Sequence, residues 1–151
     1  MIHYVFDICG TLLDDEGFLD KDFADFFREW SEGQRVTILS EGANSRHIAN
    51  VSLLGRHIEP MVGPDHLHRT MNSILAEPRL SRVNLFMNLE RNVERYRPIA
   101  EQLWGHAQGH CVTPVASFED TWQALQSTLR PSWDRAASRH QVRPFIYHNA
   151  A

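Results

Sequence analysis

Apolar residues recur along the chain at two different spacings, and the spacing changes repeatedly between residue 1 and about residue 129. Short runs of β-branched, aromatic and aliphatic residues, bounded by Gly, Asn, Asp or Ser, predict buried strands. Stretches in which apolar residues lie three and four positions apart predict helices with one buried face. Strands are therefore expected at 1–6, 35–40, 57–62, 83–87 and 111–115.

Helices are expected between consecutive strands. The first follows Asp20, carries an apolar stripe on one face and ends at Gly33. The stripe consists of Phe23, Phe26, Phe27 and Trp30. Further helices are expected at 41–54, 63–77, 91–104 and 117–129, the last behind a capping-box pattern. Helices that alternate with strands are typical of α/β proteins, so we expect one doubly wound, Rossmann-like parallel sheet of about five strands.

Composition is consistent with one globular domain. The chain has 151 residues, of which 42% are hydrophobic and 23% charged, and this is enough apolar material for a substantial core. We expect a single domain over 1–151, with no role assigned to the tail 130–151. The net charge of −4 does not indicate a nucleic-acid partner. No segment is typical of a signal peptide or a membrane span, which favours a soluble, cytoplasmic protein with no membrane partner.

The first strand ends at an acidic residue, Asp7, which is followed by Gly10 and Thr11. Ligands of open α/β sheets bind beyond the carboxyl ends of the strands, and a glycine lets the backbone turn close to a ligand. Asp7 is therefore a candidate site residue. The alternative is an ordinary strand-end Asp that caps the next element.

The segment Tyr4-Val5-Phe6-Asp7-Ile8-Cys9-Gly10-Thr11-Leu12 resembles the first motif of the haloacid dehalogenase-like (HAD) hydrolase superfamily. The resemblance implies that Asp7 attacks phosphorus and forms an aspartyl-phosphate, with Gly10 and Thr11 binding substrate. Family phosphatases carry a second Asp two positions later, as general acid and base, where this chain has Cys9. A thiol is a weak proton donor, so slow dephosphorylation is expected. As a covalent nucleophile, Cys9 lacks any His that the sequence alone can place beside it.

Two further segments resemble the second and third motifs. Val36-Thr37-Ile38-Leu39-Ser40 matches the apolar strand whose terminal hydroxyl binds a phosphate oxygen, and Ser40 is expected at a helix N-terminus. The alternative for Ser40 is a plain helix cap. The third motif of the family requires a cation. The only Lys, Lys21, lies in the helix after the first motif, which is the wrong place, so the catalytic candidate is Arg69. The alternative for Arg69 is a solvated surface residue.

The fourth expected strand and the residues after it resemble the family's last motif in their spacing. The chain keeps the ending Asn92-Val93-Glu94 but has Asn88 where the family has a metal-binding Asp, and Glu90 is the nearest acid. The resemblance implies a Mg²⁺ ion bound weakly by Asp7, Asn88 and Glu90, because Mg²⁺ is usually anchored by one or two carboxylates.

The resemblance implies a HAD-like phosphomonoesterase that acts through Asp7. The short segment between Thr11 and the first helix indicates that the chain has no cap domain. Capless members tend to act on large substrates, so the resemblance implies a phosphorylated substrate, with a macromolecule included among the candidates. The sequence does not indicate an oligomeric state. Two alternatives stay open: a catalytically impaired binding or regulatory module, and a metal-free hydrolase of the dehalogenase type.

Overall fold

The computed structural model describes residues 1–40, 44–62, 65–88, 97–98, 101 and 110–129. These residues form five strands and four helices. In chain order they are β1 (Ile2–Phe6), α1 (Lys21–Trp30), β2 (Arg35–Leu39), α2 (Ser45–Ser52), β3 (His57–Glu59), α3 (His66–Leu75), β4 (Arg82–Asn88), β5 (Cys111–Val115) and α5 (Phe118–Ser127).

All five strands are parallel, in the order β3-β2-β1-β4-β5. The α/β prediction is therefore confirmed. The chain proceeds outward from β1 to β3 and then returns to the other side of β1 to form β4. The order thus reverses between β1 and β4, and it is at such a switch point that open sheets leave a crevice beyond the strand ends. β5, which contains Pro114, lies at an edge as expected, since proline cannot donate a ladder hydrogen bond.

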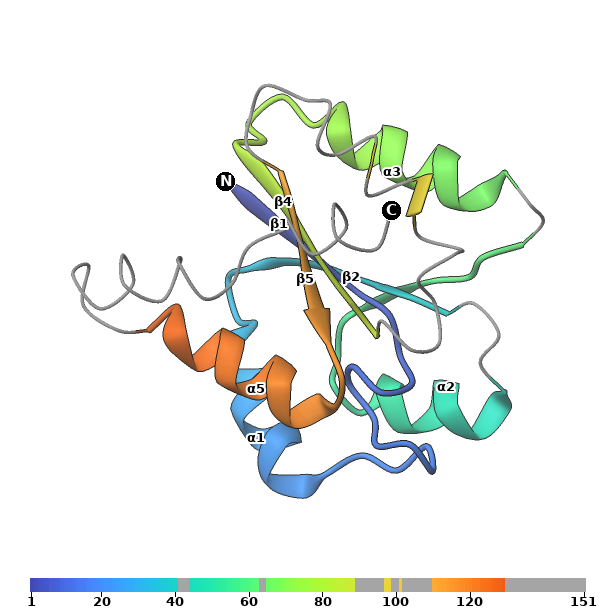
Figure 1. Cartoon of the computed structure of the whole chain (residues 1–151), viewed down its shortest axis with the longest axis vertical. Coiled ribbons are helices and arrows are strands. Elements are labelled where there is room, and N and C mark those ends of the chain that lie inside the picture. Colours follow the sequence, from blue (N-terminus) through green and yellow to red (C-terminus); the bar gives the residue numbers. More distant parts are fainter. Residues whose placement is uncertain (41–43, 63–64, 89–96, 99–100, 102–109, 130–151) are drawn as a thin grey trace.

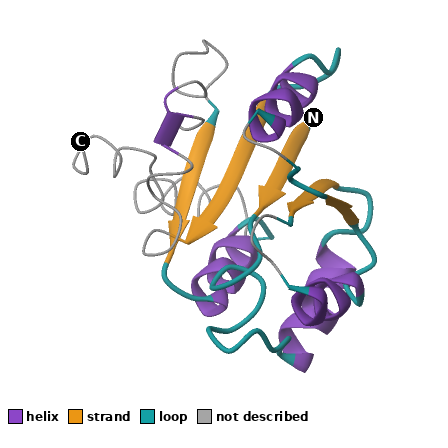
Figure 2. Ribbon diagram, turned by 90° about the vertical axis from the view of Figure 1, so that its right-hand side faces the viewer, coloured by secondary structure: helices purple, strands orange, loops and turns teal. Residues whose placement is uncertain are grey.

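Helices pack on both faces of the sheet (Figures 1 and 2). On one face α1, α2 and α5 surround the larger apolar cluster, in which Phe6 of β1 stacks on Phe86 of β4 and meets Phe27 of α1 edge-on. On the other face α3 packs Leu67, Met71 and Ile74 on a second cluster. The alternation of side chains along each strand produces these two faces.

Two helix starts differ in how well the sequence predicts them. α1 begins where expected, with the Asp20 side chain accepting the Phe23 N–H at 2.8 Å. α2 begins at Ser45, not at residue 41, because the Asn44 side chain caps it by accepting the His47 N–H at 2.9 Å. β3 is shorter than expected and ends at Glu59.

Several expected features lie outside the described residues: most of the helix at 91–104, and the whole tail 130–151. Among the helices that are described, none has the length and apolar character required to cross a membrane.

Candidate functional site

Asp7 lies immediately after β1, at the point where the strand order reverses. Its backbone N–H donates to the Phe86 carbonyl of β4 at 3.1 Å, which extends the β1–β4 pairing to this residue. Its carboxylate oxygen Oδ2 accepts the backbone N–H of Asn88 at 3.0 Å, and the residue is only 3% exposed. The acid is therefore buried at the sheet edge, with its orientation fixed by the end of β4.

A tight turn follows Asp7. The N–H groups of Thr11, Leu12 and Leu13 all donate to the Ile8 carbonyl, and the Gly10 N–H donates to the Leu13 carbonyl. Gly10 has φ +76°, a conformation that glycine adopts without strain. Because the N–H groups of Gly10 and Thr11 bond within the turn, both residues shape it. The Thr11 hydroxyl is buried and has no hydrogen-bond partner among the described residues.

Asn88 joins three segments at this edge. Its side-chain nitrogen donates to the carbonyls of Gly10 and Ala116, both at 3.2 Å, and the residue is 2% exposed. A Cβ on Gly10 would lie 2.3 Å from that nitrogen, so the turn and the amide are in close contact. Asn88 therefore connects the turn after β1 to the ends of β4 and β5.

These residues fit Mg²⁺ poorly. Asp7 is the one predicted ligand here that supplies a carboxylate. Asn88 supplies an uncharged amide, whose nitrogen already donates to two backbone carbonyls. Glu90 lies outside the described residues. In the part of the chain that the structure describes, no three His, Cys, Asp or Glu side chains surround a common point. Since Mg²⁺ prefers carboxylate anchors, a site with one carboxylate is expected to be weak.

The structure brings an imidazole to Cys9. The Cys9 sulfur Sγ lies 3.3 Å from Nδ1 of His47 on α2, within hydrogen-bonding distance for a thiol. Sequence reasoning missed His47. The signal that was available is its position in the first turn of the helix after β2. β1 and β2 are parallel neighbours, so the segments that follow them meet at one edge of the sheet.

Ser40 lies at the end of β2, as expected, but not at a helix N-terminus. Its N–H and its hydroxyl both donate to the Glu59 carbonyl, at 3.0 and 3.3 Å. Since α2 begins five residues later, at Ser45, the helix dipole does not act at Ser40. To donate to a phosphate oxygen, the Ser40 hydroxyl would have to break its 3.3 Å hydrogen bond to the Glu59 carbonyl of β3.

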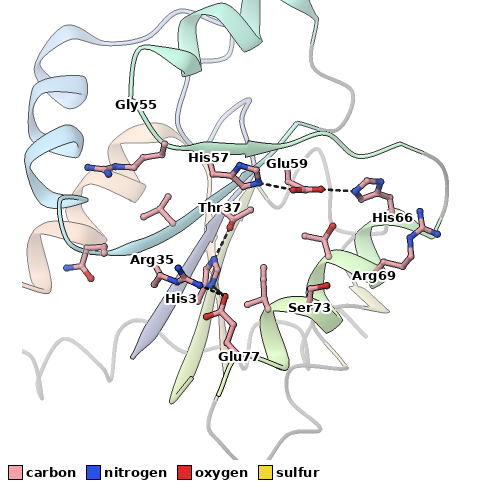
Figure 3. A pocket seen from close by; sticks show the side chains of 15 residues that line it. His3, Arg35, Thr37, Gly55, His57, Glu59, His66, Arg69, Ser73 and Glu77 are labelled. Atoms are coloured by element: carbon pink, nitrogen blue, oxygen red, sulfur yellow. Dashed lines mark hydrogen bonds and ion pairs between the residues drawn. The ribbon is translucent and has the colours of Figure 1, made fainter. Parts of the chain in front are cut away.

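Arg69 lies on α3, where it lines a cavity of about 580 Å³ between this helix and strands β1 to β3 (Figure 3). Its guanidinium makes no hydrogen bond or ion pair with the described residues. The cavity lining does not include Asp7 or Ser40. Arg69 therefore lines a cavity that Asp7 does not line.

Two hydrogen-bonded networks line this cavity (Figure 3). Buried His3 donates from Nδ1 to Glu77 at 3.1 Å, and its Nε2 lies 2.8 Å from the Thr37 hydroxyl. Burial lowers the pKa of His3, so the neutral imidazole accepts the Thr37 O–H. His66 and His57 each donate from Nε2 to one oxygen of Glu59, and these bonds lower the pKa of that carboxyl.

The structure thus brings Asp7, Cys9, Gly10, Thr11 and Asn88 together and adds His47, whereas Arg69 lines a cavity to which none of these residues contributes. Ser40 ends the strand next to β1 but bonds toward β3. Comparison of the chain with known protein families, with curated proteins and with solved structures finds no match.

Proposed function

We propose that this chain is a HAD-like phosphohydrolase that cleaves phosphomonoesters through Asp7. The observation that supports it best is the position of the Asp7 carboxylate at the switch point of a parallel sheet, oriented by the Asn88 N–H at 3.0 Å. The motif around Asp7 and the glycine turn after it add support.

In the first step the Asp7 oxygen Oδ1 attacks phosphorus, while Oδ2 stays bonded to the Asn88 N–H. The bond from phosphorus to the leaving oxygen breaks, an aspartyl-phosphate forms, and the leaving oxygen takes a proton from the Cys9–His47 pair. Covalent catalysis of this kind divides one difficult displacement into two easier ones.

Proton transfer is the expected weakness of this site. Cys9 has the position of the family's general acid, and a thiol donates protons poorly at neutral pH. His47, 3.3 Å from the Cys9 sulfur, supplies the kind of side chain most often used for proton transfer. In the second step water attacks the phosphoryl group and Asp7 leaves as carboxylate, while the water proton passes to the Cys9–His47 pair. Esters with good leaving groups are the expected best substrates.

The test is hydrolysis of p-nitrophenyl phosphate, with and without Mg²⁺, by the wild type and by Asp7→Asn. Asp22→Asn is the matched control, because Asp22 is an exposed acid in the first turn of α1. We expect turnover by the wild type and by Asp22→Asn, and none by Asp7→Asn. Wild-type turnover no higher than that of Asp7→Asn would refute the proposal.

A second function, an anion-binding or regulatory module without turnover, is supported by Asn88. Its amide is held by two carbonyls at the position where the family carries a metal-binding Asp. Phosphate binding by a wild type without phosphatase activity would favour this function. The third alternative, metal-free hydrolysis of a carbon–halogen bond by Asp7, predicts halide release from a short 2-haloacid, which the same variants test.

A further inference from the structure

The cavity beside α3 has a polar wall on the side of the sheet (Figure 3). Strands of an all-parallel sheet are usually apolar on both faces, because helices cover both of them. Here polar residues that line the cavity lie side by side on neighbouring strands. His3 of β1 pairs with Arg35 of β2. Thr37 of β2 pairs with His57 of β3, and Glu59 follows on the same face of β3. This part of the sheet therefore suits a polar group better than an apolar helix.

Helix α3 forms the opposite wall and has two different faces. Leu67, Met71 and Ile74 pack on the apolar cluster of the sheet. The polar residues that line the cavity recur at intervals of three and four positions, so they lie along one side of the helix. They are His66, Arg69, Thr70, Ser73 and, just beyond the helix, Glu77. Helix α3 thus places a polar stripe along the cavity.

The two acids of the cavity differ in how far their oxygens are occupied. Each carboxylate oxygen of Glu59 accepts one imidazole N–H. In Glu77, Oε1 accepts both the His3 ring at 3.1 Å and the Arg35 guanidinium at 3.0 Å. The other oxygen, Oε2, is buried and accepts no hydrogen bond from the described residues. A buried acceptor without a donor is unfavourable, and a donor on a ligand would remove that cost.

Donors are available further along α3. The Arg69 guanidinium and the hydroxyls of Thr70 and Ser73 form no hydrogen bond with the described residues. Three arginines and two glutamates line the cavity, which gives it one net positive charge while its histidines are neutral. Its volume of about 580 Å³ lies within the range of about 300–1,000 Å³ that is typical of small-molecule sites. Arg69 and Glu77 lie roughly two helical turns apart, or about 11 Å along the axis, so a chain of several carbon atoms fits between them.

We propose that this cavity binds a small polyhydroxylated anion. Its oxyanion is held by Arg69, and a hydroxyl of its carbon chain donates to Oε2 of Glu77. The hydroxyls of Thr70 and Ser73 bind the hydroxyls in between. A guanidinium binds carboxylate and phosphate in the same bidentate way, so a sugar acid and a sugar phosphate are two sources of this chemistry. Asp7 does not line the cavity, so the site goes beyond the proposed phosphohydrolase and does not rest on it.

The test is titration calorimetry of the full chain with four probes: gluconate, glucose 6-phosphate, glucose and inorganic phosphate. Glucose lacks the oxyanion, and inorganic phosphate lacks the hydroxylated chain. We expect gluconate or glucose 6-phosphate to bind about tenfold or more tightly than glucose, because a hydrogen bond to a charged group contributes about that factor. The same ligand is expected to bind more tightly than inorganic phosphate, because only a hydroxylated chain reaches Glu77.

Variants assign the binding to this cavity. Arg69→Gln is expected to weaken binding of the preferred ligand by about tenfold. Arg79→Gln is the matched control, because Arg79 is also exposed but does not line the cavity. Glu77→Gln, which replaces the acceptor Oε2 by an amide donor, is expected to weaken binding of the sugar ligand and to leave binding of inorganic phosphate unchanged. Asp7→Asn is expected to leave the affinity for the preferred ligand unchanged, which separates this site from the region around Asp7.

The outcomes do not depend on turnover. Preference for gluconate supports the site and assigns a carboxylate to Arg69, whereas preference for glucose 6-phosphate supports it and assigns a phosphate. Absence of binding of both ligands up to about 10 mM would overturn the proposal. Equal affinities of Arg69→Gln and Arg79→Gln would overturn it as well, and so would a loss of binding in Asp7→Asn. Inorganic phosphate that binds as tightly as glucose 6-phosphate would overturn the role of Glu77.

Discussion

Replacing Gly10 with alanine tests whether the contact between the Asp7 turn and Asn88 stabilises the fold. Gly10 has φ +76°, and an added Cβ would lie 2.3 Å from the Asn88 side-chain nitrogen and 2.9 Å from its Cγ. No Cβ tolerates such distances, so the Asn88 amide would have to move. Both of its hydrogen bonds, to Gly10 and to Ala116, depend on its present position.

The expected loss of stability has two parts. A left-handed backbone costs a non-glycine residue about 1–2 kcal/mol. A buried amide deprived of its hydrogen bonds costs about 1–3 kcal/mol more. Gly10→Ala is therefore expected to lower the free energy of unfolding by about 2–5 kcal/mol, a large share of the 5–15 kcal/mol typical of a domain.

Gly33→Ala separates the two parts. Gly33 has φ +78°, but a Cβ there would meet nothing within 4 Å, so only the backbone cost of about 1–2 kcal/mol is expected. Urea denaturation followed by circular dichroism measures both variants. The reasoning is refuted if Gly10→Ala and Gly33→Ala destabilise equally. In addition, the double variant Gly10→Ala/Asn88→Ala should lose less stability than the sum of the losses in the two single variants.

Two further predictions concern histidines. His47→Gln is expected to slow hydrolysis of an alkyl phosphate by about tenfold or more while affecting p-nitrophenyl phosphate much less, because only the alkyl leaving group needs a proton; equal effects in steady-state assays would contradict this role. Burial lowers the pKa of His3, so the unfolded chain binds the proton more readily, and stability is expected to fall as the pH drops below about 6.5. In urea titrations between about pH 6.5 and 5, the loss of stability with falling pH should be smaller for His3→Gln than for the wild type. Glu59 does not interfere in this window, because its lowered pKa places its contribution at more acidic pH. An equal dependence of stability on pH in both proteins would contradict the His3 prediction.

Local sequence patterns predicted much of the fold. The apolar run before Asp7, the stripe of α1 and the edge position of the Pro114 strand were recoverable because they depend on nearest-neighbour preferences and on periodicity. The start of α2 was predicted four residues too early. Asn44 competes with Ser40 for the role of cap, and only the observed hydrogen bond to the His47 N–H shows which residue has it.

The alternation of strands and helices could be predicted from the chain alone, and so could the acid and glycine turn that follow the first strand. Which side chains meet at that turn depends on the folded arrangement of the strands. Cys9 and His47 are 38 residues apart, and Asn88 reaches Gly10 across 78 residues, so these contacts depend on strand order and register. For the same reason the sequence could not show that Arg69, which suits an anion site by residue type, lines the cavity between α3 and the sheet: its place is set by the packing of α3 on the sheet.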